Sequence, residues 1–318
     1  MRKQIVLLVV TAVLLSCVTV VPAGAAVRYV RIGTASMGGA FYPMGNALAQ
    51  LFTDKLSGVR ASSQSTGGSA ENCRLLARKE LELGLVQSAT LKEALAGVGQ
   101  FKDGPVTGLR AITAIYFMPF HVIARKDANI DSVADLRGKK IGVGPIGSGI
   151  EVNALMLLAA HGIGAKDFQA IHQSQQETYE GLKTGSVHAH IYATGAGSAQ
   201  ITDVMLTGKV RLLPIDGGMV KSIMASNPEF GRYRIAAKTY PNQPDMLDTF
   251  AGSAVLVARA DLDEAVVYEM TKAIFENLPY LSERHAYFEQ TNADDATVGI
   301  VLDLHPGAER YLKDVGAI

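Results

Sequence analysis

Short apolar runs alternate with amphipathic, helix-like segments along most of the chain. The first apolar run, residues 29–32, is followed by a loop of glycine and hydroxyl residues at 33–39 and by a helical pattern at 42–51. Repeated alternation of strand and helix patterns predicts an α/β fold with doubly wound sheets.

The same loop chemistry follows later strands in both halves of the chain. Expected strands at 59–65, 82–86, 139–144 and 187–193 each lead into a polar loop that begins a helix. Because open α/β sheets bind ligands beyond the carboxyl ends of their strands, these loops would face one crevice. Glycines let a bound group approach the backbone closely, and the free N–H groups of helix N-termini favour an anion. The pattern therefore predicts an anion-binding crevice, with ordinary capped turns as the alternative.

Two stretches are placed to connect the halves. An apolar run at 111–124, split by Pro119, suits one long strand or a pair of strands, and an apolar strand at 249–258 suits the return. Crossings near 125–132 and 237–249 would form a two-segment hinge. The resulting division is lobe I at 27–127 plus 249–318, and lobe II at 128–248. Helices packed on lobe I are expected at 262–277, 279–287 and 294–301.

The first 26 residues have the pattern of a cleavable signal peptide. Arg2 and Lys3 precede an apolar run at 5–21, and small residues at 22–26 provide a cleavage site. A retained membrane anchor is the alternative, and residues 14–17 weakly resemble a lipoprotein cleavage box. We expect export to the periplasm.

Composition narrows the function classes. The chain has 318 residues, 48% hydrophobic and 19% charged, which indicates about two globular domains. Lysine plus arginine equals aspartate plus glutamate at 30 each, so no strong field favours nucleic acid. Loss of Cys17 with the signal peptide would leave Cys73 alone, in a helical pattern typical of a buried residue. A single cysteine precludes the common cysteine-based zinc sites, and we expect neither a metal nor a cofactor.

One motif resembles a dinucleotide-binding site, which would indicate an enzyme. Gly142, Gly144 and Gly147 have the spacing of a dinucleotide-binding fingerprint, but the acidic residue expected about 20 positions later is missing, because the next strand ends at His172. The sequence also lacks the common hydrolase and metalloprotease motifs. Ser148 lies between two glycines, where an anion cradle needs no catalytic base. A binding protein is therefore favoured over an enzyme.

A set of motifs extends from the first loop to the C-terminus. They are IGTASMGGAFYPMGNAL at 32–48, STGGSAEN at 65–72, LVQS at 85–88 and VGPIGSG at 143–149, followed by residues 182–189, 192–195, 213–217, 239–243 and 305–308. In this order they resemble the TAXI-type solute-binding proteins of TRAP (tripartite ATP-independent periplasmic) transporters. The resemblance covers nearly all of the chain after the expected signal peptide.

The resemblance implies a two-lobed type II periplasmic binding protein with two doubly wound sheets joined by a hinge. It implies a small carboxylate ligand, such as glutamate or 2-oxoglutarate, held between the lobes. It also implies delivery to TRAP membrane subunits in which the small and large components are fused. A monomeric receptor is expected. An ABC-type binding protein on the same fold, for a different small ligand, is the main alternative, and a secreted enzyme is a further one.

The polar loops and the resemblance together define the expected ligand-binding residues. These are Thr34, Ser36, Gly38, Gly39, Tyr42, Ser65, Gly68, Ser69, Gln87, Ser88, Gly147, Ser148 and Thr194. No arginine lies within the polar loops, so helix N-termini and hydroxyl groups would supply most of the anion binding, with Arg31, Arg125 and His121 as unplaced cations. The sequence departs from the family at Ile150, where threonine is usual, and at residues 117–118, which would make one cleft wall more apolar.

Overall fold

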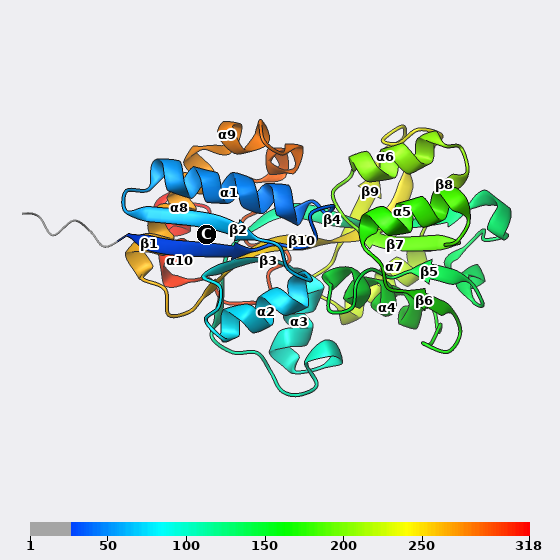
Figure 1. The fold of residues 1–318 in the computed structure, drawn as a ribbon, viewed down its shortest axis with the longest axis horizontal. Coiled ribbons are helices and arrows are strands. Elements are labelled where there is room, and N and C mark those ends of the chain that lie inside the picture. The colour runs from blue at the N-terminus through cyan, green and yellow to red at the C-terminus, as the bar shows by residue number, and fades with distance from the viewer. Residues whose placement is uncertain (1–26) are drawn as a thin grey trace, which may run out of the picture.

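The computed structural model describes residues 27–318, which form two groups of strands and helices lying side by side (Figure 1). The expected signal peptide lies outside these described residues. Helices cover both faces of the strands in each group, so the expected α/β fold is confirmed. None of the helices within residues 27–318 is both long and apolar enough to cross a membrane.

The first group is built on three parallel strands, β1 (Arg28–Gly33), β2 (Val59–Gln64) and β3 (Leu83–Gln87). β1 lies between the other two and pairs with β2 over its full length. Each strand leads into a helix, in turn α1 (Phe41–Lys55), α2 (Ser69–Ala77) and α3 (Ser88–Ala96). The N-termini of the three helices therefore lie at the carboxyl edge of the sheet.

The second group repeats this arrangement. Its parallel strands are β5 (Lys140–Gly142), β6 (Gln169–Ile171) and β7 (Ala189–Ala193), followed in turn by α4 (Gly149–Ala160), α5 (Gln175–Thr184) and α6 (Ala199–Leu206). The group is completed by β8 (Val210–Leu213), α7 (Gly217–Ser226) and β9 (Gly231–Ile235). The sequence pattern did not predict β9, because it is a mostly exposed strand with little apolar character.

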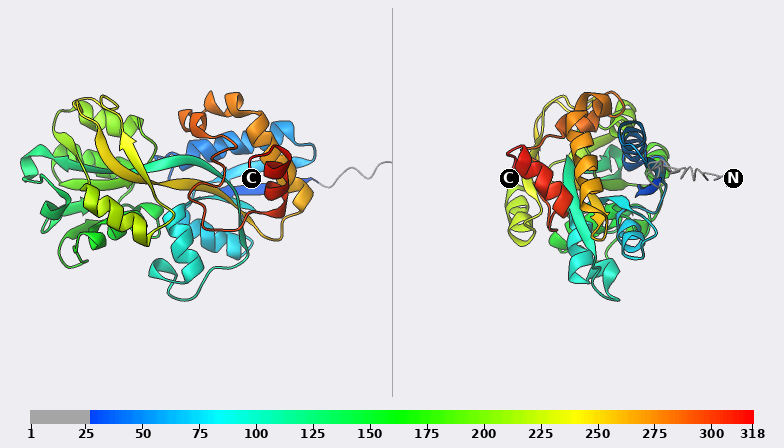
Figure 2. Two further views of the ribbon diagram at one scale, coloured as in Figure 1. Left: turned by 180° about the vertical axis from the view of Figure 1, so that it is seen from behind. Right: turned by 90° about the vertical axis from the view of Figure 1, so that its left-hand side faces the viewer.

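Two long antiparallel strands, β4 (Leu109–Arg125) and β10 (Leu247–Arg259), run from one group into the other (Figures 1 and 2). β4 pairs with β10 as far as Pro119, and from Phe120 onward it pairs with β7 and β8. The apolar run at 111–124 is thus one strand. Its crossing lies between Pro119 and Phe120 instead of near 125–132, because the strand continues straight into the second sheet. The crossing in β10 lies near Ala251, beside the expected segment.

Aromatic rings pack against one another where β4 and β10 pass from the first group into the second. The ring centroid of Phe120 lies 4.2 Å from that of Phe250 and 5.5 Å from that of Phe230. The hydroxyl of Thr249 also donates to the carbonyl of Phe120 at 2.9 Å. All four side chains are buried, so the two strands are held together as they pass between the groups.

The C-terminal part of the chain returns to the first group (Figure 2). Its helices are α8 (Glu264–Glu276), α9 (Leu278–Ser282) and α10 (Pro306–Asp314). The expectation of one helix at 279–287 is wrong, because the chain is extended at His285 and resumes only as the 3₁₀ turn Ala286–Gln290. No helix forms at 294–301, where Gly299 adopts a left-handed conformation with φ of 73°. Three further 3₁₀ turns occupy Gly99–Phe101, Lys126–Ala128 and Val133–Leu136.

Cys73 lies on α2 and is fully buried among apolar side chains of α2, α3 and β10. Burial raises the pKa of its thiol to about 12, so the thiolate is not available as a nucleophile at neutral pH. The expected structural role of this cysteine agrees with its place in the fold.

Candidate functional site

A cavity lies where the two groups meet, and five helices direct their N-termini toward it. Phe41 of α1, Ser69 of α2, Gly149 of α4 and Gln175 of α5 are the first residues of their helices and line the cavity, as does Gln87, which immediately precedes α3. The N–H groups of a first helical turn have no partner within the helix, and the positive end of the helix dipole is there. Five such ends surround a cavity whose lining contains no cation, and a glutamate in the first turn of α2, α4 and α5 offsets part of their dipole charge.

The lining of the cavity is electrically neutral. Seventeen residues surround about 420 Å³ of space not occupied by protein atoms, including the part that opens to solvent, and none of them is an Asp, Glu, Lys, Arg or His. No side chain of the lining therefore carries a charge that could pair with a charged ligand group.

Four polar side chains of the lining accept hydrogen bonds from the protein itself. Ser69 Oγ accepts from the N–H of Gln87 at 3.1 Å, and Ser148 Oγ accepts from the N–H of Glu151 at 3.2 Å. Each hydroxyl hydrogen is then free to donate. The turns between strand and helix place both serine oxygens at the beginning of a helix. Ser148 is the N-cap of α4. Ser69 is the first residue of α2 and not its N-cap, because Gly68 occupies that position with a φ of 107° that suits glycine.

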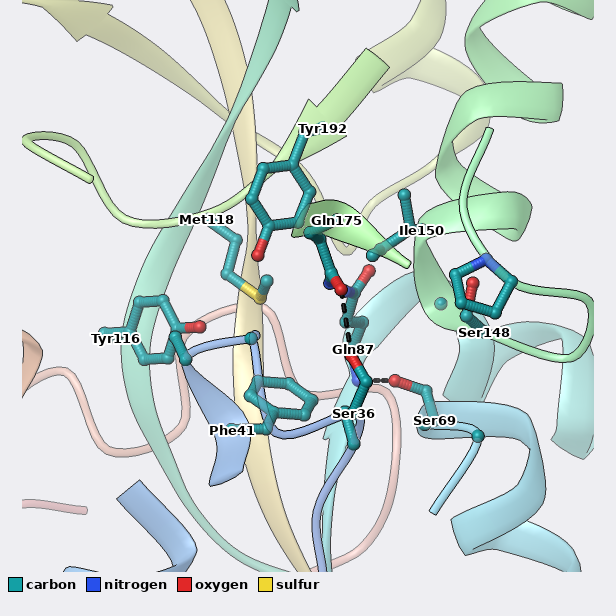
Figure 3. Close-up of a pocket in the computed structure, with 17 residues that line it drawn as sticks. Ser36, Phe41, Ser69, Gln87, Tyr116, Met118, Ser148, Ile150, Gln175 and Tyr192 are labelled. Carbon is teal, nitrogen blue, oxygen red and sulfur yellow. Dashed lines mark hydrogen bonds between the residues drawn. The ribbon is translucent and has the colours of Figure 1, made fainter. Parts of the chain in front are cut away.

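The two glutamines of the lining are oriented in the same way. Gln175 Oε1 accepts from Ser36 Oγ at 2.9 Å (Figure 3). Gln87 Oε1 accepts from the amide of Asn153. Both amide nitrogens remain as donors. The cavity thus presents mainly N–H and O–H groups.

Aromatic and apolar side chains form the opposite wall. Tyr116, Met118, Tyr192 and Phe41 lie on the side of the cavity away from Ser69 and Ser148 (Figure 3). The hydroxyl of Tyr116 is buried and makes no hydrogen bond within the described chain. Burial raises the pKa of Tyr116 well above its usual value, and burial together with the nearby Tyr287 raises that of Tyr192 to about 12. Both phenols are therefore neutral at physiological pH and can act as donors to a ligand.

We expect Tyr116→Phe to weaken ligand binding about tenfold without destabilising the unliganded protein. The substitution removes a buried hydroxyl that has no partner, which is neutral or stabilises the fold by about 1 kcal/mol, whereas a bound ligand would lose a hydrogen bond. Tyr179→Phe is the matched control, since its hydroxyl is also buried and unpartnered but does not line the cavity. Urea unfolding and titration calorimetry measure the two effects, and equal ligand affinities for both variants would contradict the expectation.

The two groups already touch across the cavity. Besides the contact between Ser36 and Gln175, Gln200 Nε2 donates to the carbonyl of Gly38 at 2.5 Å and Gln100 Nε2 donates to Glu151 Oε2 at 2.8 Å. Each bond joins a residue of the first group to one of the second. The structure therefore shows the closed arrangement of the two groups.

The structure places six of the expected ligand-binding residues on the cavity. These are Ser36, Gly39, Gly68, Ser69, Gln87 and Ser148. The other seven lie outside the lining, namely Thr34, Gly38, Tyr42, Ser65, Ser88, Gly147 and Thr194. Several of the hydroxyls in this second set point back into the protein.

The hydrogen bonds of these outlying residues show why they do not line the cavity. Thr34 Oγ1 donates to the carbonyl of Gln64 at 2.7 Å, and Ser65 Oγ donates to that of Ala35 at 3.0 Å. Ser88 Oγ accepts from the N–H of Ser253 at 3.1 Å and so contacts β10. These side chains fix the loops, whereas their neighbours face the cavity.

The cations considered from the sequence are all engaged elsewhere. The guanidinium of Arg31 donates two hydrogen bonds to the carboxylate of Glu82, and Arg125 forms an ion pair with Asp127. His121 is buried and contacts the hydroxyl of Tyr240 at 2.9 Å. Within residues 27–318, no group of three or more His, Cys, Asp or Glu side chains is arranged to hold a metal ion.

The sequence did not identify several of the residues that line the cavity. Phe41, Tyr116, Gln175 and Tyr192 were not among the candidates, although Gln175 follows the capping Ser174 at a recognisable helix start. Ile150 and Met118, two positions at which the sequence departs from the family pattern, both line the cavity. Phe117 instead lines a separate hollow with Phe230 and Tyr233 on the other side of the strands, since successive strand residues point to opposite faces.

Three solved structures have a similar arrangement. MatC from Rhodopseudomonas palustris with bound malate gives a TM-score of 0.57 at 14% identity, covering 91% of this chain and 97% of that chain. XAC2383 from Xanthomonas citri bound to ATP gives 0.52 at 12% identity, covering 91% and 96%. A putative L-cystine ABC transporter from Listeria monocytogenes gives 0.51 at 14% identity, covering 84% and 99%.

The two sheets, the paired crossing strands and the cavity between the groups define the type II periplasmic binding-protein fold, as expected from the sequence. Residues 32–316 match the NMT1-like family over nearly the whole described chain. The protein belongs to the NMT1-like family.

Proposed function

We propose that this protein is an extracytoplasmic receptor that captures a small carboxylate between two lobes and delivers it to a membrane transporter. The observation that carries the proposal is the convergence of five helix N-termini on one uncharged cavity. Such ends bind anions through oriented N–H groups without needing a cationic side chain. A structural neighbour that holds malate is consistent with this ligand class.

Capture would couple ligand binding to closure of the lobes. We assign residues 27–119 and 251–318 to lobe I and residues 120–250 to lobe II, following the crossings of β4 and β10. Lobe I contributes Ser36, Ser69 and Gln87, and lobe II contributes Ser148 and Gln175. A ligand held by both sets stabilises the closed form by its differential affinity, and the transporter would recognise that form.

The finer assignment is a TAXI-type receptor that works in the periplasm as a monomer with fused TRAP membrane subunits. Its support is the order of motifs along the sequence, from residues 32–48 to 305–308. The alternative is an ABC-type receptor, because the same fold serves both kinds of transporter. A secreted enzyme is a weaker alternative, since the lining offers neither an ionised carboxylate nor a histidine as a general base.

A thermal-shift screen tests the proposed ligand class. The purified protein is heated with 2-oxoglutarate, malate, glutamate, aspartate and neutral sugars, each at millimolar concentration. A ligand at 100 times its Kd stabilises the folded state by about 2.7 kcal/mol, which raises the Tm by several degrees. Stabilisation by a sugar but by no carboxylate would contradict the proposal, and turnover of any of these compounds would favour the enzyme.

Transport measurements separate the two transporter classes. Vesicles containing the candidate membrane subunits are supplied with this protein and the labelled acid that the screen identifies. Uptake driven by an ion gradient in the absence of ATP is expected for a TRAP partner. Uptake that requires ATP would assign the receptor to an ABC transporter instead.

A further inference from the structure

We infer that the cavity selects small carboxylates that lack an ammonium group, such as oxo- or hydroxy-acids, over amino acids of the same carbon skeleton. The inference rests on the proposed function and narrows its ligand class. An α-ammonium group is a triple donor that must find acceptors or a carboxylate when it is buried. The cavity lining offers it no carboxylate.

The lining side chains have their acceptor atoms engaged by the protein. Ser69 Oγ, Ser148 Oγ, Gln87 Oε1 and Gln175 Oε1 each accept a hydrogen bond from another residue. Their remaining polar hydrogens face the cavity as donors. A ligand carboxylate, keto or hydroxyl oxygen fits these donors, whereas an ammonium group would have to share oxygens that each already accept one bond, with no carboxylate to pair with.

The backbone carbonyls of the lining loops are engaged as well. The carbonyl of Ala35 accepts from Ser65 Oγ at 3.0 Å, and that of Ser36 accepts from the N–H of Gly39 at 2.9 Å. The carbonyl of Gly68 accepts from the N–H of Asn72 at 2.9 Å, and that of Pro145 accepts from the N–H of the N-cap Ser148 at 3.1 Å. Each of these four carbonyl oxygens therefore already accepts a hydrogen bond from the protein.

The carboxylates nearest to the cavity are bound to the same loops. Glu71 Oε2 accepts from the N–H of Gly67 at 2.5 Å, and Glu151 Oε2 accepts from the N–H of Gly147 and from Gln100 at 2.9 and 2.8 Å. Neither glutamate lines the cavity. Both hold loops in place and are not positioned to pair with a ligand ammonium group.

The aromatic wall does not replace a carboxylate. Phe41, Tyr116 and Tyr192 could in principle attract a cation through their ring faces. Five helix N-termini surround the same volume, each with a partial positive charge equivalent to about half an elementary charge. A glutamate in the first turn of three of these helices, Glu71, Glu151 and Glu177, offsets part of that charge. What opposes a buried cation here is that no carboxylate lines the cavity, and the rings would contact the carbon skeleton of the ligand.

Titration calorimetry of matched acid pairs tests the inference. The pairs are 2-oxoglutarate with L-glutamate, and malate and oxaloacetate with L-aspartate, so that the members of a pair differ mainly at the α-carbon. We expect the non-amino member of whichever pair binds to have an affinity at least about tenfold higher. An amino acid that binds as tightly as its partner, or more tightly, would overturn the inference and leave the proposed function intact. Failure of all members to bind would instead overturn the proposed function.

A charge-introducing variant gives an independent readout. Gln175→Glu places a carboxylate at the first position of α5, a site where helix dipoles tolerate a negative charge, and it preserves the acceptor for Ser36. We expect it to shift the oxo-acid to amino-acid affinity ratio by at least about tenfold toward the amino acid. Gln176→Glu is the control, because it makes the same charge change at the next, exposed position. An identical ratio for both variants and the unmodified protein would contradict the inference.

Discussion

Gly149→Ala is expected to lower ligand affinity by at least about 100-fold while leaving the fold of the unliganded protein intact. Gly149 begins α4 in the second group, and a methyl group at this position would lie 2.7 Å from Ser69 Oγ and 2.7 Å from Gln87 Cδ of the first group. Contacts this short require the side chains of Ser69 and Gln87 to leave their positions or the two groups to move apart. Because the clash exists only across the cavity, the variant disfavours closure and not the folding of either group.

Gly217→Ala is the matched control for this prediction. Gly217 is the first residue of α7, and an added methyl group there would meet nothing within 4 Å. Calorimetry should therefore show unchanged affinity for this variant and greatly reduced affinity for Gly149→Ala, with similar Tm values in the absence of ligand. Tight binding by Gly149→Ala would show that the ligand-bound form does not bring these residues together.

Acid is expected to destabilise the protein by several kcal/mol between pH 6.5 and pH 4. Burial lowers the pKa of both His121 and His190 from 6.5 to about 4, despite a hydrogen bond from each ring to a backbone carbonyl. The unfolded chain therefore binds more protons than the folded one in this interval. Stability is fully present above pH 6.5 and is lost as the pH falls, with an upper limit of about 3 kcal/mol for each histidine.

Urea unfolding at pH 7, 6, 5 and 4.5 measures this dependence. His190→Phe keeps an aromatic ring stacked on Tyr192 and removes the titrating group, so its stability should fall less steeply with pH than that of the unmodified protein. His121→Gln should flatten the profile separately, and the two effects should add unless the rings are coupled. Variants with the same slope as the unmodified protein would show that neither histidine governs the acid response.

The sequence predicted the loops of the site better than their orientation. Ser36, Ser69 and Ser148 stand in glycine-rich turns after strands, and that local pattern suffices to place them near the carboxyl edge of a sheet. Thr34 and Ser65 belong to the same turns, but they donate to backbone carbonyls behind the cavity. Which hydroxyl faces a ligand depends on the exact turn geometry, and residue type alone does not determine it.

Residues contributed by long-range packing were beyond local patterns. Tyr116 and Met118 lie on one long apolar strand, where residues of both faces look alike until the position of the second group is known. Gln175 reaches the cavity only because α5 points at the first group. The crossing point within β4 was not predicted for a related reason, since nothing in its continuous apolar pattern marks the change of partner after Pro119.

The paired strands at the crossing also limit how the protein can open. Pro119 and Ala251 are register partners, and the rings of Phe120 and Phe250 stack immediately beyond them. Sliding one connection past the other would break ladder bonds and separate buried rings, whereas a change in twist along the ribbon preserves both. Opening should therefore proceed by twisting of the paired strands β4 and β10. The stiffness of this two-stranded ribbon would then set how far apart the two groups lie in the absence of ligand.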